Sequence, residues 1–187
     1  SIREKTLGPN HPEVANSLNN LGSVFYARYA RTGQLADLEE AIHVWQTAIQ
    51  HTPPDSPDMP GYLNNLGSGL RARYAHTGYW SDLEEAIRAW QTAAMRTPPD
   101  SSDLPARLNN LGNGLSTRYA RSGQLADLEE AIRVYQTAVQ RTPPDSPDRS
   151  ALLNNLGNGL RARYAGSGQL ADLEEAIRVY QTVVQRT

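Results

Sequence analysis

The chain repeats itself every 45 residues, and this period constrains its fold more than any single residue does. The segment Leu-Asn-Asn-Leu-Gly occurs four times, and Asp-Leu-Glu-Glu-Ala-Ile follows it each time in the same register. A fixed period of this length is typical of a solenoid, in which one supersecondary unit stacks on the next. Stacked copies offer a long, repeated surface and no natural place for a single catalytic site. The period therefore favours a binding protein over an enzyme.

Each copy reads as two amphipathic helices separated by short turns. In the third copy, apolar residues recur every three or four positions, first from Leu108 to Tyr119 and then from Leu128 to Val139. This spacing is that of one face of an α-helix, and no segment alternates in the way a half-buried strand does. The predicted fold class is all-α, with four helix-turn-helix repeats in one solenoid.

The same spacing predicts the element boundaries. We expect first helices at 12–31, 57–76, 102–121 and 147–165, and second helices at 36–51, 81–96, 126–141 and 171–186. The repeats then span about 12–56, 57–101, 102–146 and 147–187 of one domain, 1–187, in which residues 1–7 match the end of a preceding second helix. Asp127 and Glu130 have the spacing of a capping box, and Ser146-Pro147 that of a cap and first helical residue. Both chain ends look cut, so we expect a piece of a longer protein.

Composition argues against several functions. The net charge is −2 and no basic run is present, so nucleic acid is not an expected partner. The absence of cysteine excludes disulfides and thiolate metal sites, and the four histidines share no helical face. No apolar run approaches the ~20 residues of a membrane span, and no signal peptide opens the chain. We therefore expect a cytoplasmic protein that has no cofactor, no metal and no enzymatic activity.

The landmarks of each copy resemble those of the tetratricopeptide repeat. In the third copy these landmarks are Gly112, Ala131, Tyr135, Ala138 and Pro143. The offsets from the alanine to the proline are those of the family, and only the last copy departs, with valine in place of the second alanine. The resemblance implies a right-handed α-solenoid that binds a protein or peptide partner on a concave face lined by the first helices.

The repeat is longer than the common tetratricopeptide repeat of about 34 residues. The extra residues fall in the first helix and in the Pro-Pro-Asp-Ser-Pro-Asp turn. This long form resembles the tetratricopeptide arrays of large fungal and bacterial multidomain proteins. Such arrays are often joined to caspase-like CHAT modules or to NB-ARC nucleotide-binding switch domains. The opening stretch, from Ser1 to Ala15, is similar to the kinesin-light-chain type of repeat instead.

Asparagines in the first helices are the sharpest chemical signal. The predicted peptide-binding residues are Asn19, Asn20, Asn64, Asn65, Asn109, Asn110, Asn113, Asn154, Asn155 and Asn158. Asparagine is a mediocre helix former, and its amide both donates and accepts, so a ladder of amides could hold an extended peptide backbone. The resemblance supports this role for the second asparagine of each pair. The alternative is that one member of each pair bonds to the neighbouring repeat.

Arginines on the same helices are weaker candidates. Arg71 and Arg161 could add contacts to a ligand carboxylate, as could three others, Arg73, Arg118 and Arg163. The alternative for each of them is simply solubility. An aromatic pair, Tyr79-Trp80, replaces Gln-Leu in the second repeat, and core packing is the preferred interpretation over a partner anchor. Trp45 and Trp90 align with tyrosines of the later copies, which predicts that both lie in the core.

Differences between the last two copies concentrate in one helix. Residues 106–142 and 151–187 differ at five positions, of which four lie in the first helix. These four are Arg107/Leu152, Ser116/Arg161, Thr117/Ala162 and Arg121/Gly166. Such a pattern is expected of a surface adapted to a partner, and equally of neutral drift at solvated positions.

Self-association is the alternative to peptide binding. Solenoids normally end in repeats with polar outer faces. The last helix carries Ile177, Tyr180, Val183 and Val184 with no distinct cap after it. One chain's end could therefore stack on the start of the next, in an open head-to-tail array.

Overall fold

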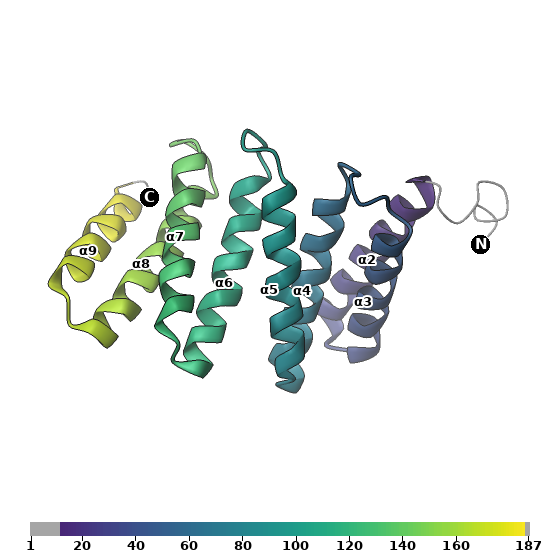
Figure 1. Cartoon of the computed structure of the whole chain (residues 1–187), viewed down its shortest axis with the longest axis horizontal. Helices are drawn as coiled ribbons and strands as arrows, with labels where there is room; N and C mark the ends of the chain where they lie inside the picture. The colour runs from purple at the N-terminus through teal and green to yellow at the C-terminus, as the bar shows by residue number, and fades with distance from the viewer. Residues whose placement is uncertain (1–11, 186–187) are drawn as a thin grey trace. The chain divides into compact units, whose positions relative to one another are not determined.

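The computed structural model describes residues 12–185 and contains, within that range, eight α-helices and no strand. The first helices of the repeats are α2 (Pro12–Thr32), α4 (Met59–Thr77), α6 (Leu104–Ser122) and α8 (Arg149–Ser167). The second helices are α3 (Leu35–Gln50), α5 (Trp80–Arg96), α7 (Leu125–Arg141) and α9 (Leu170–Val184). Figure 1 shows them as successive antiparallel hairpins. The predicted all-α class of four helix-turn-helix repeats is confirmed.

The chain divides into two compact units, the first ending at Arg96 and the second starting at Thr97. Each unit holds two hairpins, and the second helix of one hairpin packs on the first helix of the next, as α3 does on α4 and α7 on α8. That all four hairpins share one continuous, right-handed solenoid remains a prediction. The predicted helix end at residues 1–7 lies outside the described residues.

Within each unit the first helices lie on the inner side. The first helices contact each other, α2 with α4 and α6 with α8, whereas the described parts of α3 and α5, or of α7 and α9, have no such contact. Helices that approach closely on one side of a stack and diverge on the other make that unit curve toward the first helices. The inner surface of each unit is therefore made by the helices that carry the asparagines.

Short turns set the helix boundaries within about two residues of the prediction. Gly123, at φ 71°, ends α6 in the left-handed region, and its N–H donates to the carbonyl of Tyr119 at 2.7 Å. The expectation that Ser146 and Pro147 cap and start the next helix is wrong, because α8 begins at Arg149. Ser146 instead accepts a hydrogen bond from the Asp148 N–H inside the proline turn.

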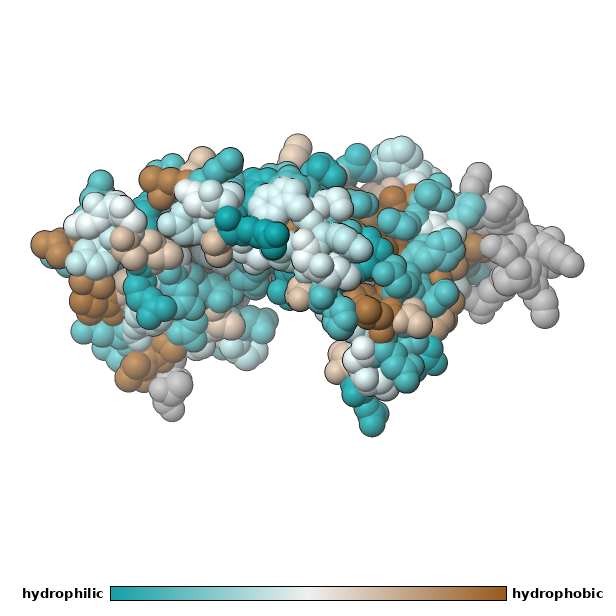
Figure 2. Space-filling view, turned by 90° about the horizontal axis from the view of Figure 1, so that it is seen from below, coloured by the Kyte–Doolittle hydropathy of each residue, from teal (hydrophilic) through white to brown (hydrophobic). Residues whose placement is uncertain are grey.

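The core of each hairpin is one aromatic residue seated on glycine. Trp45 and Trp90 are 2% and 1% exposed, which confirms their predicted place in the core. In the third hairpin Tyr135 takes this place, and a Cβ on Gly112 would stand 2.4 Å from its ring. The aromatic ring thus occupies the space that a side chain at this glycine would need. Figure 2 shows a face of the molecule on which hydrophilic side chains predominate and hydrophobic ones form small, separate groups.

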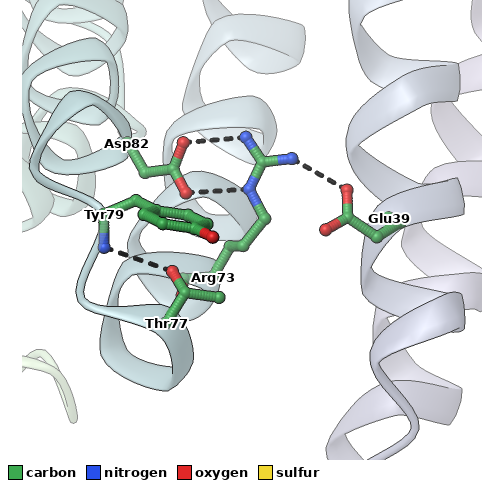
Figure 3. A network of polar contacts seen from close by, with 5 residues as sticks. All are labelled: Glu39, Arg73, Thr77, Tyr79 and Asp82. Atoms are coloured by element: carbon green, nitrogen blue, oxygen red, sulfur yellow. Dashed lines mark hydrogen bonds and ion pairs between the residues drawn. The ribbon is translucent and has the colours of Figure 1, made fainter.

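An arginine–aspartate pair closes every hairpin. Arg73 on α4 donates two hydrogen bonds to Asp82 on α5, from Nε and from Nη2, each at 2.8 Å (Figure 3). The same pairing recurs as Arg28–Asp37, Arg118–Asp127 and Arg163–Asp172. The predicted capping box at Asp127 is therefore wrong. The carboxylate turns back to the preceding helix, because a bidentate guanidinium satisfies it better than a single backbone N–H.

Candidate functional site

A groove on the inner surface of the second unit brings several predicted residues together. It has a volume of about 480 Å³ and lies between α6 and α8. Tyr135, Leu128 and Gly159 are the nonpolar part of its lining. The polar part consists of Asn113, Ser116, Thr117, Asn155 and Asn158, with Tyr119, Ala120 and Ala162 completing the lining. We call this the α6–α8 groove.

Tyrosine hydroxyls orient two of the groove amides. The hydroxyl of Tyr135 donates to Asn113 Oδ1 at 2.8 Å, and that of Tyr180 donates to Asn158 Oδ1 at 2.8 Å. Each amide oxygen therefore accepts one hydrogen bond, and the described residues supply no partner for its Nδ2. Two N–H₂ groups of fixed orientation are left to act as donors in the groove. Carbonyl and carboxylate oxygens are the ligand atoms that such donors bind.

Asn155 contributes both kinds of hydrogen-bonding group. Its Nδ2 donates to Asn109 Oδ1 at 2.8 Å, which ties α8 to α6. One N–H of the amide is used in this way, while the second N–H and the oxygen have no partner among the described side chains. The groove thus combines three amides, of which Asn155 has an oxygen that accepts no hydrogen bond from the described residues.

Asparagines of neighbouring repeats bond to each other, which is the structural alternative to peptide binding. In the first unit Asn65 Nδ2 donates to Asn19 Oδ1 at 2.9 Å, in the same way as Asn155 does to Asn109. In both units the first asparagine of one repeat binds the second asparagine of the next. These four residues therefore hold neighbouring first helices together, which accounts for amides in mid-helix.

The remaining predicted residues lie elsewhere. Asn20 and Asn154 are exposed, as are Arg71 and Arg161, and none of the four lines the α6–α8 groove. The backbone carbonyl of Asn64 accepts the indole N–H of Trp90 at 3.2 Å. Arg73, Arg118 and Arg163 are bound to aspartates of their own hairpins, so their guanidinium groups stabilise the fold.

A larger hollow lies at the proline turns of the same unit. Its volume is about 920 Å³, and Asn109 and Asn110 are part of its lining together with Pro99, Pro143 and Pro147. Its polar groups serve the turns: Arg141 donates to the carbonyl of Pro99 at 2.7 Å, and the Thr142 hydroxyl donates to the carbonyl of Ala138 at 2.7 Å. We therefore place the candidate site in the smaller groove, where amide donors remain for a ligand.

A larger side chain stands in the first unit at the position that corresponds to Ser116. Tyr26 stands one repeat pair before Ser116, and its ring lies 5.7 Å from that of Trp45, centre to centre. At Ser116 the side chain is a hydroxymethyl group, whose oxygen lies 3.3 Å from the Tyr135 hydroxyl. Exchange of a phenol ring for a hydroxyl opens the groove in the second unit.

One of the variable positions has a structural explanation. Arg107 reaches the Thr97 hydroxyl and pairs with Asp103 at 2.9 Å, and burial lowers its pKa. In the next repeat Leu152 takes the place of Arg107, and Arg149 donates instead to the carbonyls of Val139 and Thr142. A guanidinium thus reaches the start of the proline turn in both repeats, from residues three positions apart. This difference reflects packing and not a partner.

The core aromatic and the inner-surface residue vary together. Hairpins with tryptophan, Trp45 and Trp90, have serine one turn before the groove position, and hairpins with tyrosine have asparagine there. The indole N–H of Trp45 donates to the backbone carbonyl of Asn19 at 3.1 Å and needs no side-chain acceptor. The tyrosine hydroxyl, in contrast, donates to the asparagine side chain. This pairing is visible in the sequence and marks Asn113 and Asn158 as partners of the core.

We expect the two positions to be energetically coupled. Replacement of Asn113 by serine removes the acceptor of the Tyr135 hydroxyl, which should lower the free energy of unfolding by about 1 kcal/mol. In a Tyr135→Trp background the same replacement should have almost no effect, because the indole N–H binds the backbone. Urea denaturation of the two single variants and the double variant measures the coupling. Additive effects would contradict the pairing.

The aromatic pair at the turn of the second repeat is on the surface. Tyr79 is 66% exposed and Trp80 is 38% exposed, so the interpretation as core packing is wrong. Figure 3 shows the Tyr79 ring beside the Arg73–Asp82 pair, with the backbone N–H of Tyr79 bound to the Thr77 hydroxyl. The exposure follows from the position of the pair at the outer tip of the hairpin.

Residues 12–185 contain neither a membrane-spanning helix nor a metal-binding cluster. None of the helices in this range is both long enough and apolar enough to cross a bilayer. The described histidine, aspartate and glutamate side chains form no group of three suited to a metal ion.

Comparison with known proteins agrees with the hairpin architecture. The tetratricopeptide-repeat family model matches residues 14–58, 106–148 and 150–186. The crystal structure of MamA is similar with a TM-score of 0.62 and 15% identity, over 92% of this chain and 77% of that one. A putative kinesin light chain with nearly identical TPR-like repeats, from Podosopora anserina, is similar with a TM-score of 0.59 and 18% identity, over 94% and 90%.

The other comparisons define how far this likeness extends. The structure named DHF58 filament is similar with a TM-score of 0.51 and 14% identity, over 92% of each chain. No curated protein sequence is significantly similar. At these identities the solved structures support the fold alone, whereas the family model covers more than half of the chain. From its repeats, its aromatic-on-glycine core and this match, the chain belongs to the tetratricopeptide-repeat family.

Proposed function

We propose that this chain is a non-catalytic interaction scaffold that binds an extended peptide along the inner surface of its second unit. Tetratricopeptide repeats generally mediate protein–protein interaction, and the family is generally non-catalytic. The observation that carries the proposal is the α6–α8 groove, in which Asn113, Asn155 and Asn158 line a cavity of about 480 Å³.

The chemistry of the groove favours a peptide backbone as ligand. Two oriented N–H₂ groups suit carbonyl oxygens, and the remaining acceptor on Asn155 suits a backbone N–H. An extended peptide presents both groups at a regular spacing, and its own side chains need not be recognised. The nonpolar lining, which includes Leu128 and Tyr135, offers contact for one small apolar side chain of the peptide. No charged residue lines the groove, so electrostatic selection of a charged ligand is not expected.

Filling the groove should abolish binding without unfolding the chain. We expect Ser116→Tyr to place a phenol ring where Tyr26 lies in the first unit. A suitable probe is a 12-residue peptide selected from a random phage-displayed library on the immobilised wild-type chain. Its affinity, measured by isothermal titration calorimetry, should fall at least tenfold in the variant, because the ring excludes the peptide from the amides.

The matched control adds the same ring elsewhere. Met95 lies on α5 and is 85% exposed, so Met95→Tyr should leave both affinity and thermal stability unchanged. Peptides that bind Ser116→Tyr as tightly as wild type would place the interaction outside the groove and contradict the proposal.

Two further variants separate binding from stability. Asn158→Ala removes a groove amide together with the acceptor of Tyr180, whereas Tyr180→Phe removes only the hydrogen bond between them. Tyr180 does not line the groove. The proposal therefore expects weaker peptide binding in Asn158→Ala than in Tyr180→Phe. Equal losses in both would assign Asn158 a structural role alone.

A further inference from the structure

The proline turns contain every serine and threonine of the chain that is followed directly by proline. These residues are Thr52, Ser56, Thr97, Thr142 and Ser146. A serine or threonine before proline is the acceptor that proline-directed protein kinases modify. The structure separates the threonines of this group from the serines.

The three threonines are inaccessible. Thr52, Thr97 and Thr142 are 8%, 5% and 6% exposed. The hydroxyl of Thr52 donates to the carbonyl of Ala48 at 2.6 Å, and that of Thr142 donates to the carbonyl of Ala138 at 2.7 Å. These hydroxyls bind the ends of second helices, so a kinase cannot reach them while the helix ends stay folded.

Ser56 lies in the accessible part of its turn. Its N–H donates to the carbonyl of Pro53 at 3.0 Å, which makes a β-turn, and its Oγ accepts a hydrogen bond from the Asp58 N–H at 3.2 Å. Ser56 is half-buried, whereas residues 53–55 and 57–58 are exposed. Figure 1 shows the turn between α3 and α4 projecting beyond the ends of both helices. Exposed turns outside the helices are among the parts of a fold that open most easily, as binding to a kinase in an extended form requires.

Neighbouring repeats leave such a turn exposed. Residues 97–103 form the same kind of turn and have repeats before and after them in the chain. Ser101 donates to the carbonyl of Pro98 at 3.0 Å, and its Oγ accepts from the Asp103 N–H at 3.2 Å. Ser101 is half-buried and the residues on both sides of it are exposed, in the same pattern as at Ser56. The accessibility of Ser56 is therefore a property of the turn and does not depend on where the array ends.

An arginine of the next hairpin is bound to the turn that holds Ser56. Arg96, at the end of α5, donates from Nη1 to the carbonyl of Pro54. Its side chain is exposed, and its Nε and Nη2 have no acceptor among the described residues. Arg141 binds the carbonyl of Pro99 in the same way at 2.7 Å. A guanidinium with unused donors thus stands beside Pro54, two residues before Ser56, and such a group binds phosphate through two hydrogen bonds.

We propose that Ser56 is a phosphorylation site for a proline-directed serine kinase and that Arg96 binds the phosphate. In this reaction the Ser56 Oγ attacks the γ-phosphorus of ATP, the bond from that phosphorus to the β–γ bridging oxygen breaks, and ADP leaves. The hydroxyl proton passes to a basic group of the kinase. The phosphate carries a charge of roughly −2 and accepts hydrogen bonds from Arg96 and from the Asp58 N–H. It thereby ties the end of α5 to the turn before α4, independently of peptide binding in the groove.

Two carboxylates oppose the phosphate, but only weakly. Asp55 and Asp58 are both exposed, and repulsion between exposed charges is screened by water and salt. The start of α4 at Met59, three residues after Ser56, favours negative charge. Together with the hydrogen bonds from Arg96, this outweighs the repulsion, so phosphorylation should stabilise the first unit.

Phosphorylation of the whole chain tests the site. The kinase is chosen as a proline-directed one that phosphorylates a free peptide of residues 50–62 with ATP and Mg²⁺. Mass spectrometry of fragments of the full chain should then place one phosphate on Ser56 and none on Thr52. The Ser56→Ala chain should lose this phosphate. Failure of every proline-directed kinase on the peptide, an unmodified Ser56 in the chain, or phosphate on Thr52 instead would overturn the site.

The third turn provides a matched control. Ser101 is followed by Ser102, whereas Ser146, in the fourth repeat, is followed by proline. The same kinase should therefore modify Ser146 and leave Ser101 unmodified in the wild-type chain. Ser102→Pro should make Ser101 an acceptor, because the backbone of this turn already matches that of the other two. Equal modification of Ser101 in the wild-type and Ser102→Pro chains would overturn the role of the proline.

Thermal unfolding tests the role of Arg96. Tryptophan fluorescence should give a Tm about 4 °C higher for the phosphorylated chain than for the unmodified chain, because new charge-assisted hydrogen bonds form. In Arg96→Gln, compared with and without the phosphate, this rise should disappear. Ser56→Ala treated with the kinase should show no rise. A Tm that is unchanged or lower after phosphorylation, or a rise that persists in Arg96→Gln, would overturn the pairing.

Discussion

Gly112→Ala should lower the free energy of unfolding of the second unit by about 2 kcal/mol. The added methyl carbon would stand 2.4 Å from Cε1 and 2.7 Å from Cζ of Tyr135, whose side chain is only 3% exposed. The ring cannot withdraw, because its hydroxyl is bound to Asn113. Overpacking of this kind costs about 3 kcal/mol, and the better helix propensity of alanine returns about 1 kcal/mol.

A glycine in an open position provides the control. Gly61 lies in α4, and a Cβ there would have no atom within 4 Å. Gly61→Ala should therefore be neutral or stabilise the chain by about 0.5 kcal/mol. Urea denaturation followed by far-ultraviolet circular dichroism measures both variants. A Gly112→Ala variant as stable as Gly61→Ala would show that the aromatic ring does not need the glycine.

Asp82→Ala should destabilise the first unit by about 2 kcal/mol. Only 6% of the Asp82 side chain is exposed, and the carboxylate accepts both hydrogen bonds from Arg73. These bonds hold the pKa of the Arg73 guanidinium above its usual value, as expected for a closely paired ion. Loss of one partner from a buried pair costs about 3–5 kcal/mol, and the 22% exposure of the arginine side chain reduces this figure.

The same arginine supplies its own control. Glu39 binds the other side of Arg73, but its side chain is 54% exposed. Glu39→Ala should therefore cost no more than about 0.5 kcal/mol. All three tryptophans lie in the first unit, so tryptophan fluorescence in urea reports on this unit for both variants. Equal effects of the two substitutions would contradict the account of the hairpin closure.

The fold could be predicted from the sequence because its signal is periodic and local. Apolar spacing, the glycine at each hairpin turn and the proline turns place the boundaries of eight helices to within about two residues. The core aromatics follow from the same alignment, since a residue that recurs at one register position occupies the equivalent place in each hairpin. The prediction that Ser146-Pro147 starts a helix was wrong, because this dipeptide occurs both in turns and at helix starts. Only the backbone conformation distinguishes the two cases.

The site was harder to predict because each of its polar side chains has several possible hydrogen-bond partners. Asp127 has the spacing of a capping residue, yet Arg118, nine residues earlier, reaches it across the hairpin. The ten asparagines look equivalent in sequence, but four hold first helices together and two bind tyrosine hydroxyls. Ser116 lines the groove, and its small size stands out only by comparison with Tyr26, which occupies the same register position in the first unit.

The central claim is that groove amides bind the backbone of an extended peptide. Amide-to-ester substitution along the selected peptide tests it most directly, since an ester weakens the carbonyl acceptor and removes the N–H without changing any side chain. At the two or three positions that face the groove, calorimetry should show about tenfold weaker binding, as expected for a lost hydrogen bond of about 1.4 kcal/mol. Asn154→Ala, at an exposed position outside the groove, should keep this pattern. Esters that bind as well as the amides at every position, together with side-chain truncations that abolish binding, would contradict the claim.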